Sequence, residues 1–544
     1  MSTPHPPEAE RREPFRPPAA PPLLRVAGLL MALGFAFPGV YLVYRNFVGG
    51  ADPAGLIISS RTLGPLWRSL RLAVSVSGAA LVLGTALAWF TTRTELPFAR
   101  LWRVLLPLPL VFPTFVGAAA FIHTLNPGGL ANDLLSGIGI DRTPELRGFR
   151  GAWLVLTLMT YPYVYLPVAA RLRQLPSALE ESARVLGDTA LKAFGRICLP
   201  QIATAMGAGT LLVFLYTLSD FGAVQLMRYD TLTRAIATNQ LANPPVALAL
   251  SLLLLAVAAL VVLAERRFSR RLPDATGSRS DRPMLYSLGR GRTPAVAFVA
   301  LSAAAGVGAP LVALLDWAAR GVLRSATGGR ALTIDGFKVL EATANTVGAS
   351  VIAAVVSTAA VLPIALLVGR YRSRSGGLAH AVVISTFALP GILIALSMRF
   401  WTLRSDLAFD LLNDTMALLI FAYVVRFGSL AMGVTLVAVR SVPERLHDSA
   451  RILGAGRLRR FLAVDLPMMG PGLAAGTGLV LLSVMKELPI SLFVSPLGFF
   501  TLTTQIFGSF EEAFIAEAGI MAVVLVALSF VLTWFLVIRR DDLL

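Results

Sequence analysis

The sequence predicts an all-α integral membrane protein, with about twelve transmembrane helices in two pseudo-symmetric halves of about six helices each. Of the 544 residues, 56% are hydrophobic and 15% are charged, and the mean hydropathy is +0.72. This composition is too apolar for a soluble globular protein. The apolar residues gather into long stretches, and one long polar segment occurs twice, once in each half of the chain.

The apolar stretches have the length of helices. A helix that crosses the hydrocarbon needs about 20 mostly apolar residues, whereas a barrel strand needs only about ten. The expected first-half spans are centred on Leu30, Leu81, Val111, Leu156, Leu211 and Leu255, and the second-half spans on Val299, Val355, Ile384, Ile420, Val480 and Leu525.

Composition divides the chain into four segments. Residues 1–22 are rich in Pro and charge, which favours a disordered cytoplasmic tail over a signal peptide. Residues 23–268 form the first transmembrane half and residues 294–540 the second. Between them, residues 269–293 are polar and basic, as expected of a cytoplasmic linker.

The positions of the basic residues predict the orientation. With both termini in the cytoplasm, most Lys and Arg residues fall on the cytoplasmic side, including Arg93, Arg370 and the basic linker. The formal charge of +17 is then explained by contact with anionic membrane lipid, and no nucleic-acid partner is needed.

The repeated segment predicts a knob on the cytoplasmic face. The stretch LPSALEESARVLGDTALKAFGRICLPQI at 175–202 reappears as VPERLHDSARILGAGRLRRFLAVDLPMM at 442–469, with a constant offset of 267 residues. In each copy Pro opens a short helix, Gly187 or Gly454 ends it, and a second short helix runs to Leu-Pro. A compact helix-turn-helix of this kind suits docking into a groove on a partner protein.

Both copies resemble the EAA loop of permease subunits in binding-protein-dependent (MetI-like) ABC importers. That loop reads E-A-A, three residues, Gly, nine residues, then I-x-L-P. The first copy matches with Glu181, Ser182, Ala183, Gly187, Ile197, Leu199 and Pro200. The second matches with Asp448, Ser449, Ala450, Gly454, Val464, Leu466 and Pro467. The departures are Ser for the first Ala in both copies, and Asp for Glu and Val for Ile in the second.

The resemblance implies a translocation-path subunit in the bacterial inner membrane. Its partners would be two ATP-binding-cassette ATPase subunits, which dock on the two loops, and a periplasmic or lipid-anchored substrate-binding protein. ATP-Mg would bind to the partner ATPase and no cofactor to this chain. The stretch LSDFGAVQLMRYDTLTRAI at 218–236 and the MKELP stretch at 485–489 resemble fused two-domain ferric-iron permeases. Fused permeases for thiamine or phosphonate share this plan, so Fe3+ is the first choice of cargo and these are the alternatives.

Three intramembrane charges are candidates for the pathway or its gate. Asp220, Lys486 and Glu487 lie near the outer ends of matching helices, where ionisable groups usually face the bundle interior or water. The alternative is that they pair with each other or cap irregular helix ends. Tyr161, Tyr163 and Tyr165 are candidates for oxygen ligands or for an interfacial aromatic belt.

Enzymatic and metal motifs are missing from the sequence. No G-x-x-x-x-G-K-[ST] phosphate loop occurs, so the chain is not expected to be an enzyme that hydrolyses ATP. Cys198 is the single cysteine and is expected to be a small apolar residue, and His447, at the position of Glu180, is expected to be solvated. A competing class is the ion-coupled secondary transporter, which would show helices broken by Gly or Pro in the membrane and would need no ATPase.

Overall fold

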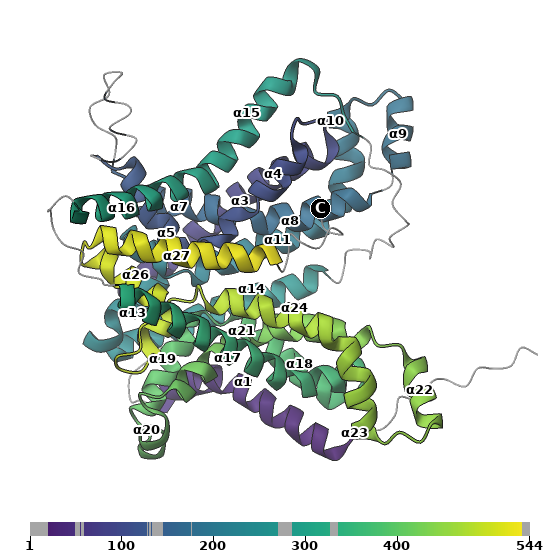
Figure 1. Cartoon of the computed structure of the whole chain (residues 1–544), viewed down its shortest axis with the longest axis vertical. Coiled ribbons are helices and arrows are strands. Elements are labelled where there is room, and N and C mark those ends of the chain that lie inside the picture. Colours follow the sequence, from purple (N-terminus) through teal and green to yellow (C-terminus); the bar gives the residue numbers. More distant parts are fainter. Residues whose placement is uncertain are drawn as a thin grey trace, which may run out of the picture.

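The computed structural model describes residues 20–48, 55, 59–127, 129, 132, 136, 145–175, 177–269, 285–326 and 336–535. Residues 1–19 of the expected tail (1–22) and residues 270–284 of the expected linker (269–293) lie outside these residues. Helices α9 and α22 carry the first parts of the two repeated segments, and both lie at the same end of the molecule (Figure 1).

The elements of the first half of the chain are α1 (Pro22–Val48), α3 (Ser60–Arg93), α4 (Ala99–Leu105), η1 (Leu108–Val111), α5 (Thr114–Leu125), α7 (Gly148–Thr160), α8 (Pro162–Gln174), α9 (Ser177–Val185), α10 (Ala190–Ala193), η2 (Phe194–Cys198), α11 (Leu199–Ser219), α12 (Gly222–Leu226), α13 (Leu232–Ala242) and α14 (Pro244–Ser269).

The elements of the second half are η3 (Gly289–Gly291), α15 (Arg292–Ala303), η4 (Ala304–Gly308), α16 (Ala309–Ala326), α17 (Gly336–Gly369), α18 (Arg374–Ser385), η5 (Thr386–Ala388), α19 (Gly391–Thr402), α20 (Asp406–Leu412), α21 (Met416–Arg440), α22 (Glu444–Ile452), α23 (Arg457–Arg460), η6 (Phe461–Asp465), α24 (Leu466–Val484), α25 (Pro489–Val494), α26 (Leu502–Glu511) and α27 (Ile515–Thr533).

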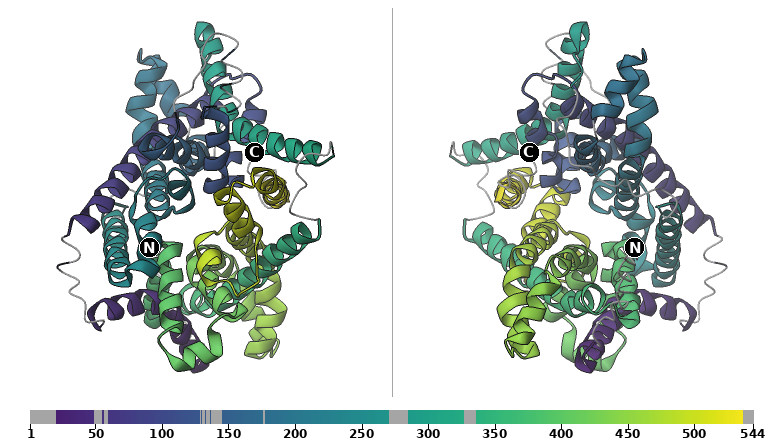
Figure 2. Two further views of the ribbon diagram at one scale, coloured as in Figure 1. Left: turned by 90° about the vertical axis from the view of Figure 1, so that its left-hand side faces the viewer. Right: turned by 90° about the vertical axis from the view of Figure 1, so that its right-hand side faces the viewer.

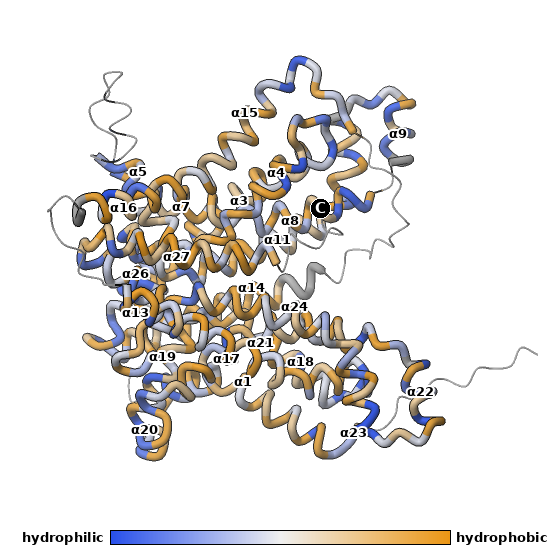
Figure 3. Tube along the Cα trace, viewed as in Figure 1, coloured by the Kyte–Doolittle hydropathy of each residue, from blue (hydrophilic) through white to orange (hydrophobic). Residues whose placement is uncertain are grey.

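The all-α membrane fold is confirmed. Within the described residues, ten helices are long and apolar enough to cross a membrane, and the number rises to twelve if each of two bent helix pairs is one span. Apolar residues dominate the long helices, whereas hydrophilic residues gather on α22 and α23 (Figure 3). The multi-pass architecture thus follows the hydropathy pattern of the sequence.

The spans expected around Val111 and Ile384 are the two bent pairs. The helices bend by 102° between Ala99–Val111 and Thr114–Leu125, and by 104° between Arg374–Ala388 and Gly391–Thr402. Pro113 and Pro390 stand at the breaks. Proline lacks an N–H group and forces the residue before it into an extended conformation, so the helix cannot continue through these positions. The pattern of apolar residues alone does not reveal such a break.

Two bundles with the same architecture are built from these elements. Helices α3, α8 and α11 pack together in one bundle, and α17, α21 and α24 pack together in the other. The first helix of each sequence half packs partly on the opposite bundle: α1 contacts α17, α18 and α19, and α16 contacts α5 (Figure 2). The bundles meet around α13, α19 and α26 and diverge toward α9 and α22 (Figure 1). We call the end with α9 and α22 the inner end and the opposite end the outer end.

Candidate functional site

The inner end carries two helix-turn-helix knobs, formed by residues 177–198 and 444–465. Gly187 and Gly454 end the first helix of each knob with φ angles of 92° and 75°. The next residues close the turns, since Asp188 N donates to Ala183 O and Ala455 N donates to Ala450 O, each at 3.0 Å. This left-handed glycine turn is a common helix C-terminus, and both copies of the repeat adopt it as the sequence predicts.

The EAA residues divide between the base and the surface of each knob. In the first knob Ala183 is buried while Glu181 and Ser182 are exposed, and in the second Asp448 and Ser449 are exposed. Ala450, Ile197 and Val464 are half-buried. Leu199, Pro200, Leu466 and Pro467 are exposed and begin the next membrane helices, α11 and α24. The structure therefore brings the E-A-A residues, the glycine and the Ile or Val of each copy into one knob, and the Leu-Pro pair begins the membrane helix that follows it.

The tips of the knobs are apolar, a feature that the sequence reasoning missed. Val185 and Leu186 are 88% and 85% exposed, and Ile452 and Leu453, at the same offset, are each 85% exposed. Large apolar side chains gathered at a protruding turn are typical of a contact with a partner protein. The signal in the sequence was the apolar pair that precedes the glycine in both copies.

The base of each knob is tied to its bundle by an arginine, which is buried in the first half and half-buried in the second. Arg93, the last residue of α3, lies 2.9 Å from Glu180 Oε1 of the first knob. Arg370, directly after α17, lies 2.5 Å from Asp465 and 3.0 Å from His447 Nδ1. We call these contacts the first joint (Arg93, Glu180) and the second joint (Arg370, His447, Asp465).

The expectation that His447 is solvated is wrong. Its side chain is 12% exposed, and its Nε2 lies 3.1 Å from Asp465 Oδ1. Burial, followed by the nearby Arg370 guanidinium, lowers the pKa of His447 below its usual value. The sequence could not show this, because Arg370 directly follows α17 and Asp465 is the last residue of η6, and neither is near His447 in the chain.

Charged side chains surround both helix breaks in the membrane. At the first break, Lys486 Nζ donates to the carbonyl oxygen of Leu110 (2.7 Å), and Asp220 accepts from Thr114 Oγ1 (2.5 Å) at the start of α5. Asp220 also accepts from the backbone N–H groups of Ala223 and Val224, at 3.0 and 3.3 Å. A cation at a carbonyl end and a carboxylate at an N–H end both oppose the local helix dipole.

The second break repeats this arrangement with other residues. Arg426 Nη1 donates to the carbonyl oxygen of Leu389 (2.6 Å). Glu487 lies against Gly391 at the start of α19, so closely that no Cβ fits there. Asp220, Lys486 and Glu487 therefore lie at the helix breaks, and their role in the pathway or its gate stays a prediction. Glu487 Oε1 is buried and has no hydrogen-bond partner in the described part of the chain.

Aromatic side chains hold the two bundles together on the outer-end side of the helix breaks. Phe221 lies 6.0 Å, centroid to centroid, from both Phe493 and Phe507, and Phe115 lies 6.2 Å from Phe507. Phe115 and Phe221 belong to the first bundle. Phe493 and Phe507 belong to the second. Such edge and tilted contacts stabilise a desolvated seam.

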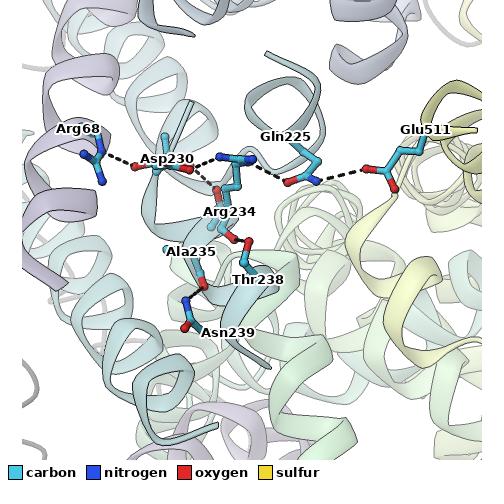
Figure 4. Close-up of polar contacts among 10 residues, drawn as sticks. Arg68, Gln225, Asp230, Arg234, Ala235, Thr238, Asn239 and Glu511 are labelled. Carbon is cyan, nitrogen blue, oxygen red and sulfur yellow. Dashed lines mark hydrogen bonds and ion pairs between the residues drawn. The ribbon is translucent and has the colours of Figure 1, made fainter. Parts of the chain in front are cut away.

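A polar chain also links the bundles at the outer end (Figure 4). Gln225 Nε2 donates to Glu511 Oε1 at 3.2 Å, and Arg234 Nε donates to Gln225 Oε1 at 3.3 Å. Arg234 also pairs with Asp230, whose carbonyl oxygen accepts from Arg68 at 2.8 Å. The outer end is thus closed by contacts between the bundles.

The tyrosines do not form an interfacial belt. Tyr161 and Tyr165 are buried inside the first bundle. Tyr161 Oη donates to Leu106 O at 2.7 Å, and Tyr165 Oη lies 3.2 Å from Thr91 Oγ1. Only Tyr163 is half-buried, and its ring lies 5.6 Å from that of Tyr216. Two of the three hydroxyls are therefore engaged in holding the bundle together.

Comparison with known proteins defines the class. The family model described as "Binding-protein-dependent transport system inner membrane component" matches twice, at residues 80–273 and 361–539. The chain therefore belongs to this family of ABC importer permeases, with the fused two-half plan. Broken membrane helices were expected of a secondary transporter, but the family match decides against that class.

Individual relatives differ in how much of the chain they match. The Fe(3+)-transport system permease protein FbpB 2 of Haemophilus influenzae is 28% identical over 520 residues, which is 94% of this chain and 97% of that protein. The molybdenum transport system permease protein ModB of Mycobacterium tuberculosis is 30% identical over 232 residues, which is 41% of this chain and 85% of that protein. The sulfate transport system permease protein CysT of Escherichia coli is 28% identical over 202 residues, 35% of this chain and 72% of that protein.

Replacing the turn glycines should uncouple ATP hydrolysis from import. No atom lies within 4 Å of a Cβ at Gly187 or Gly454, so Gly187→Val and Gly454→Val act only through the backbone. A left-handed residue with a side chain costs roughly 1–2 kcal/mol. We expect import by reconstituted complexes to fall while basal ATP hydrolysis persists. Gly456→Val, in the same loop with φ −66°, is the control and should behave as wild type. Normal import by both turn variants would remove the knobs from the coupling mechanism.

Replacing Asp220 should lower stability. Asp220→Ala removes the acceptor for Thr114 and for two backbone N–H groups, a loss of roughly 1–2 kcal/mol for a helix cap. We expect a lower melting temperature of the detergent-solubilised protein. The control is Ser219→Ala, because the Ser219 hydroxyl donates only to carbonyls of its own helix. A loss of transport at an unchanged melting temperature would assign Asp220 to the pathway instead.

Proposed function

We propose that this chain is the translocation-path subunit of an ATP-driven importer of Fe3+. The observation that carries the cargo is the length of the match to FbpB 2, which spans both halves, whereas the molybdenum and sulfate permeases match 41% and 35% of this chain. A phosphonate is the second candidate, because the putative 2-aminoethylphosphonate transport system permease protein PhnU of Salmonella typhimurium is 27% identical over 36% of this chain.

The two knobs are proposed as the docking sites for ATPase subunits. Their exposed apolar tips supply contact area, and Glu181 and Asp448 supply charge beside them. Both knobs lie on one chain, so one copy recruits two ATPase subunits. ATP-Mg binds to those subunits, and this chain supplies no nucleotide site. The inner end then faces the cytoplasm, with both termini on that side.

The divergence of the bundles at the inner end supports a mechanism of alternating access. The outer end is held by the aromatic seam and the polar chain, whereas the bundles diverge toward the inner end (Figure 1), and this difference between the two ends supports an inward-facing state. ATP binding closes the ATPase dimer and draws the knobs together, and the bundles then rotate and separate at the seam. The differential affinity of ATP for the closed dimer drives this shift.

The region between the helix breaks and the seam is proposed as the outer gate. Asp220, Lys486 and Glu487 lie there, and Lys486 of the second half caps the break in the first half. A substrate-binding protein, periplasmic or lipid-anchored, delivers cargo to the outer end. Because the charges hold the broken helices in place, opening the gate moves whole helices rather than single side chains.

The cargo is tested by reconstitution. Proteoliposomes that contain this chain, its ATPase subunits and its binding protein should take up radioactive Fe3+ only with ATP. Molybdate, sulfate, thiamine and 2-aminoethylphosphonate, each offered with the same binding protein, are the controls. Uptake of one of these in place of Fe3+ would overturn the iron assignment and leave the importer class standing.

The stoichiometry is tested by native mass spectrometry. The detergent-solubilised complex should contain one copy of this chain and two ATPase subunits, because the 267-residue offset provides two docking knobs per chain. A complex with two copies of this chain would contradict the proposal.

A further inference from the structure

Each joint pairs one arginine with one carboxylate, but the carboxylate comes from a different helix in each half. In the first joint Arg93 pairs with Glu180 of α9, and both side chains are almost completely buried. In the second joint Arg370 pairs with Asp465, which lies in η6 before the membrane helix α24. The two arginines occupy matching places at the inner ends of α3 and α17.

Comparison of the two copies of the repeat shows that the carboxylate that pairs with the arginine occupies a different position in each copy. The 267-residue offset puts His447 opposite Glu180 and Asp465 opposite Cys198. Helix η2, which ends at Cys198, contacts α9, which carries Glu180, so the two positions are neighbours in the first joint. In the second, His447 Nε2 lies 3.1 Å from Asp465. Both joints therefore require one carboxylate that pairs with the arginine. It can come from the position of Glu180 and His447 or from the position of Cys198 and Asp465.

Tyr286, in the segment between the two halves, joins the first joint. Its Oη donates to Glu180 Oε2 at 2.8 Å. Its backbone N–H donates to Arg93 O at 2.8 Å, and its carbonyl oxygen accepts from Glu95 N at 3.1 Å. The ring lies 6.2 Å from that of Trp89, and the side chain is buried. Tyr286 is therefore fixed by its backbone and its ring as well as its hydroxyl.

The arginine extends the contact to a further helix. Arg93 Nη2 donates to the carbonyl oxygens of Leu172 (2.5 Å) and Leu175 (3.2 Å) at the end of α8. The first joint thus links α3, α8, α9 and the segment between the halves. Burial, followed by the Glu180 carboxylate, raises the pKa of Tyr286, so its phenol remains protonated and available to donate.

We propose that Tyr286 is a positioning residue for the first knob, and that the described part of the linker around it, residues 285–293, therefore belongs to the coupling machinery. The proposal rests on the coupling role given to the knobs above. The Tyr286 hydroxyl holds the second oxygen of Glu180 while Arg93 holds the first. With both oxygens held, α9 cannot tilt against α3 and α8, and movement of a docked ATPase subunit passes to the bundle.

The hydroxyl of Tyr286 is tested by Tyr286→Phe, which keeps the ring and the backbone contacts. In proteoliposomes with the ATPase subunits and the Fe3+-loaded binding protein, we expect the Fe3+ imported per ATP hydrolysed to fall roughly tenfold to a hundredfold, the range for loss of one hydrogen bond to a charged group. Basal hydrolysis should stay near wild type, and the melting temperature should fall by no more than roughly a few degrees, so that the fall in the import-to-hydrolysis ratio is not due to unfolding. The control is Tyr371→Phe, which removes a hydroxyl next to Arg370 in the second half.

Three outcomes separate the proposals. An unchanged import-to-hydrolysis ratio in Tyr286→Phe overturns the positioning role. An equal fall in Tyr371→Phe also overturns it, because the effect is then not specific to the first joint. Absence of stimulated hydrolysis in the wild-type complex counts against the proposed function itself and is seen before any variant is compared.

The exchange of carboxylates provides a rescue test. Glu180→His alone leaves Arg93 without its carboxylate, and we expect it to reduce the import-to-hydrolysis ratio and the yield. The double variant Glu180→His with Cys198→Asp recreates the arrangement of the second joint, and we expect it to recover most of both. Equal failure of the single and double variants would show that the two joints do not share one requirement, and would overturn the inference.

Discussion

A helix that breaks inside the membrane leaves backbone groups that lipid cannot satisfy, and charged side chains lie at both breaks in this protein. Four side chains meet the two breaks. Lys486 and Arg426 donate to the carbonyl ends at Leu110 and Leu389. Asp220 and Glu487 lie at the N-terminal ends of α5 and α19. Two cations and two carboxylates therefore serve two breaks. The bent helices that they stabilise bring the aromatic seam to the outer end of the molecule.

The two halves share the same backbone arrangement, and both need charged side chains at the helix breaks and the joints. The residues that supply these charges differ between the halves. The break in the first half is capped by a lysine from the second half, whereas the break in the second half is capped by its own Arg426. The residue that supplies the carboxylate also differs between the joints: it is Glu180 in the first joint and Asp465 in the second. Removing one partner of a buried ion pair costs about 3–5 kcal/mol, so each exchange has to keep the pair complete. This constraint explains why duplicated halves diverge in sequence while they keep one architecture.

Much of this architecture could be predicted from the sequence, because its signals are local. The length of the apolar stretches predicted the membrane spans, and Gly187 and Gly454 predicted the turns with positive φ. The helix breaks at Pro113 and Pro390 were missed, since an apolar stretch has the same hydropathy whether it is straight or bent. The partners of His447 and Tyr286 were missed because they lie far away in the chain. Contacts between distant segments decide whether a charged residue lines a path or caps a helix, and composition does not contain them.

The central claim is that ATP draws the two knobs together while the outer seam opens. Cys198 is the single cysteine of the chain and is buried, so spin labels can be placed at Thr189→Cys and Gly456→Cys, two exposed positions related by the same offset. Double electron–electron resonance on the complex with its ATPase subunits should give a shorter distance between the labels with ATP than without it. An unchanged distance in a complex that still transports its cargo would contradict the account.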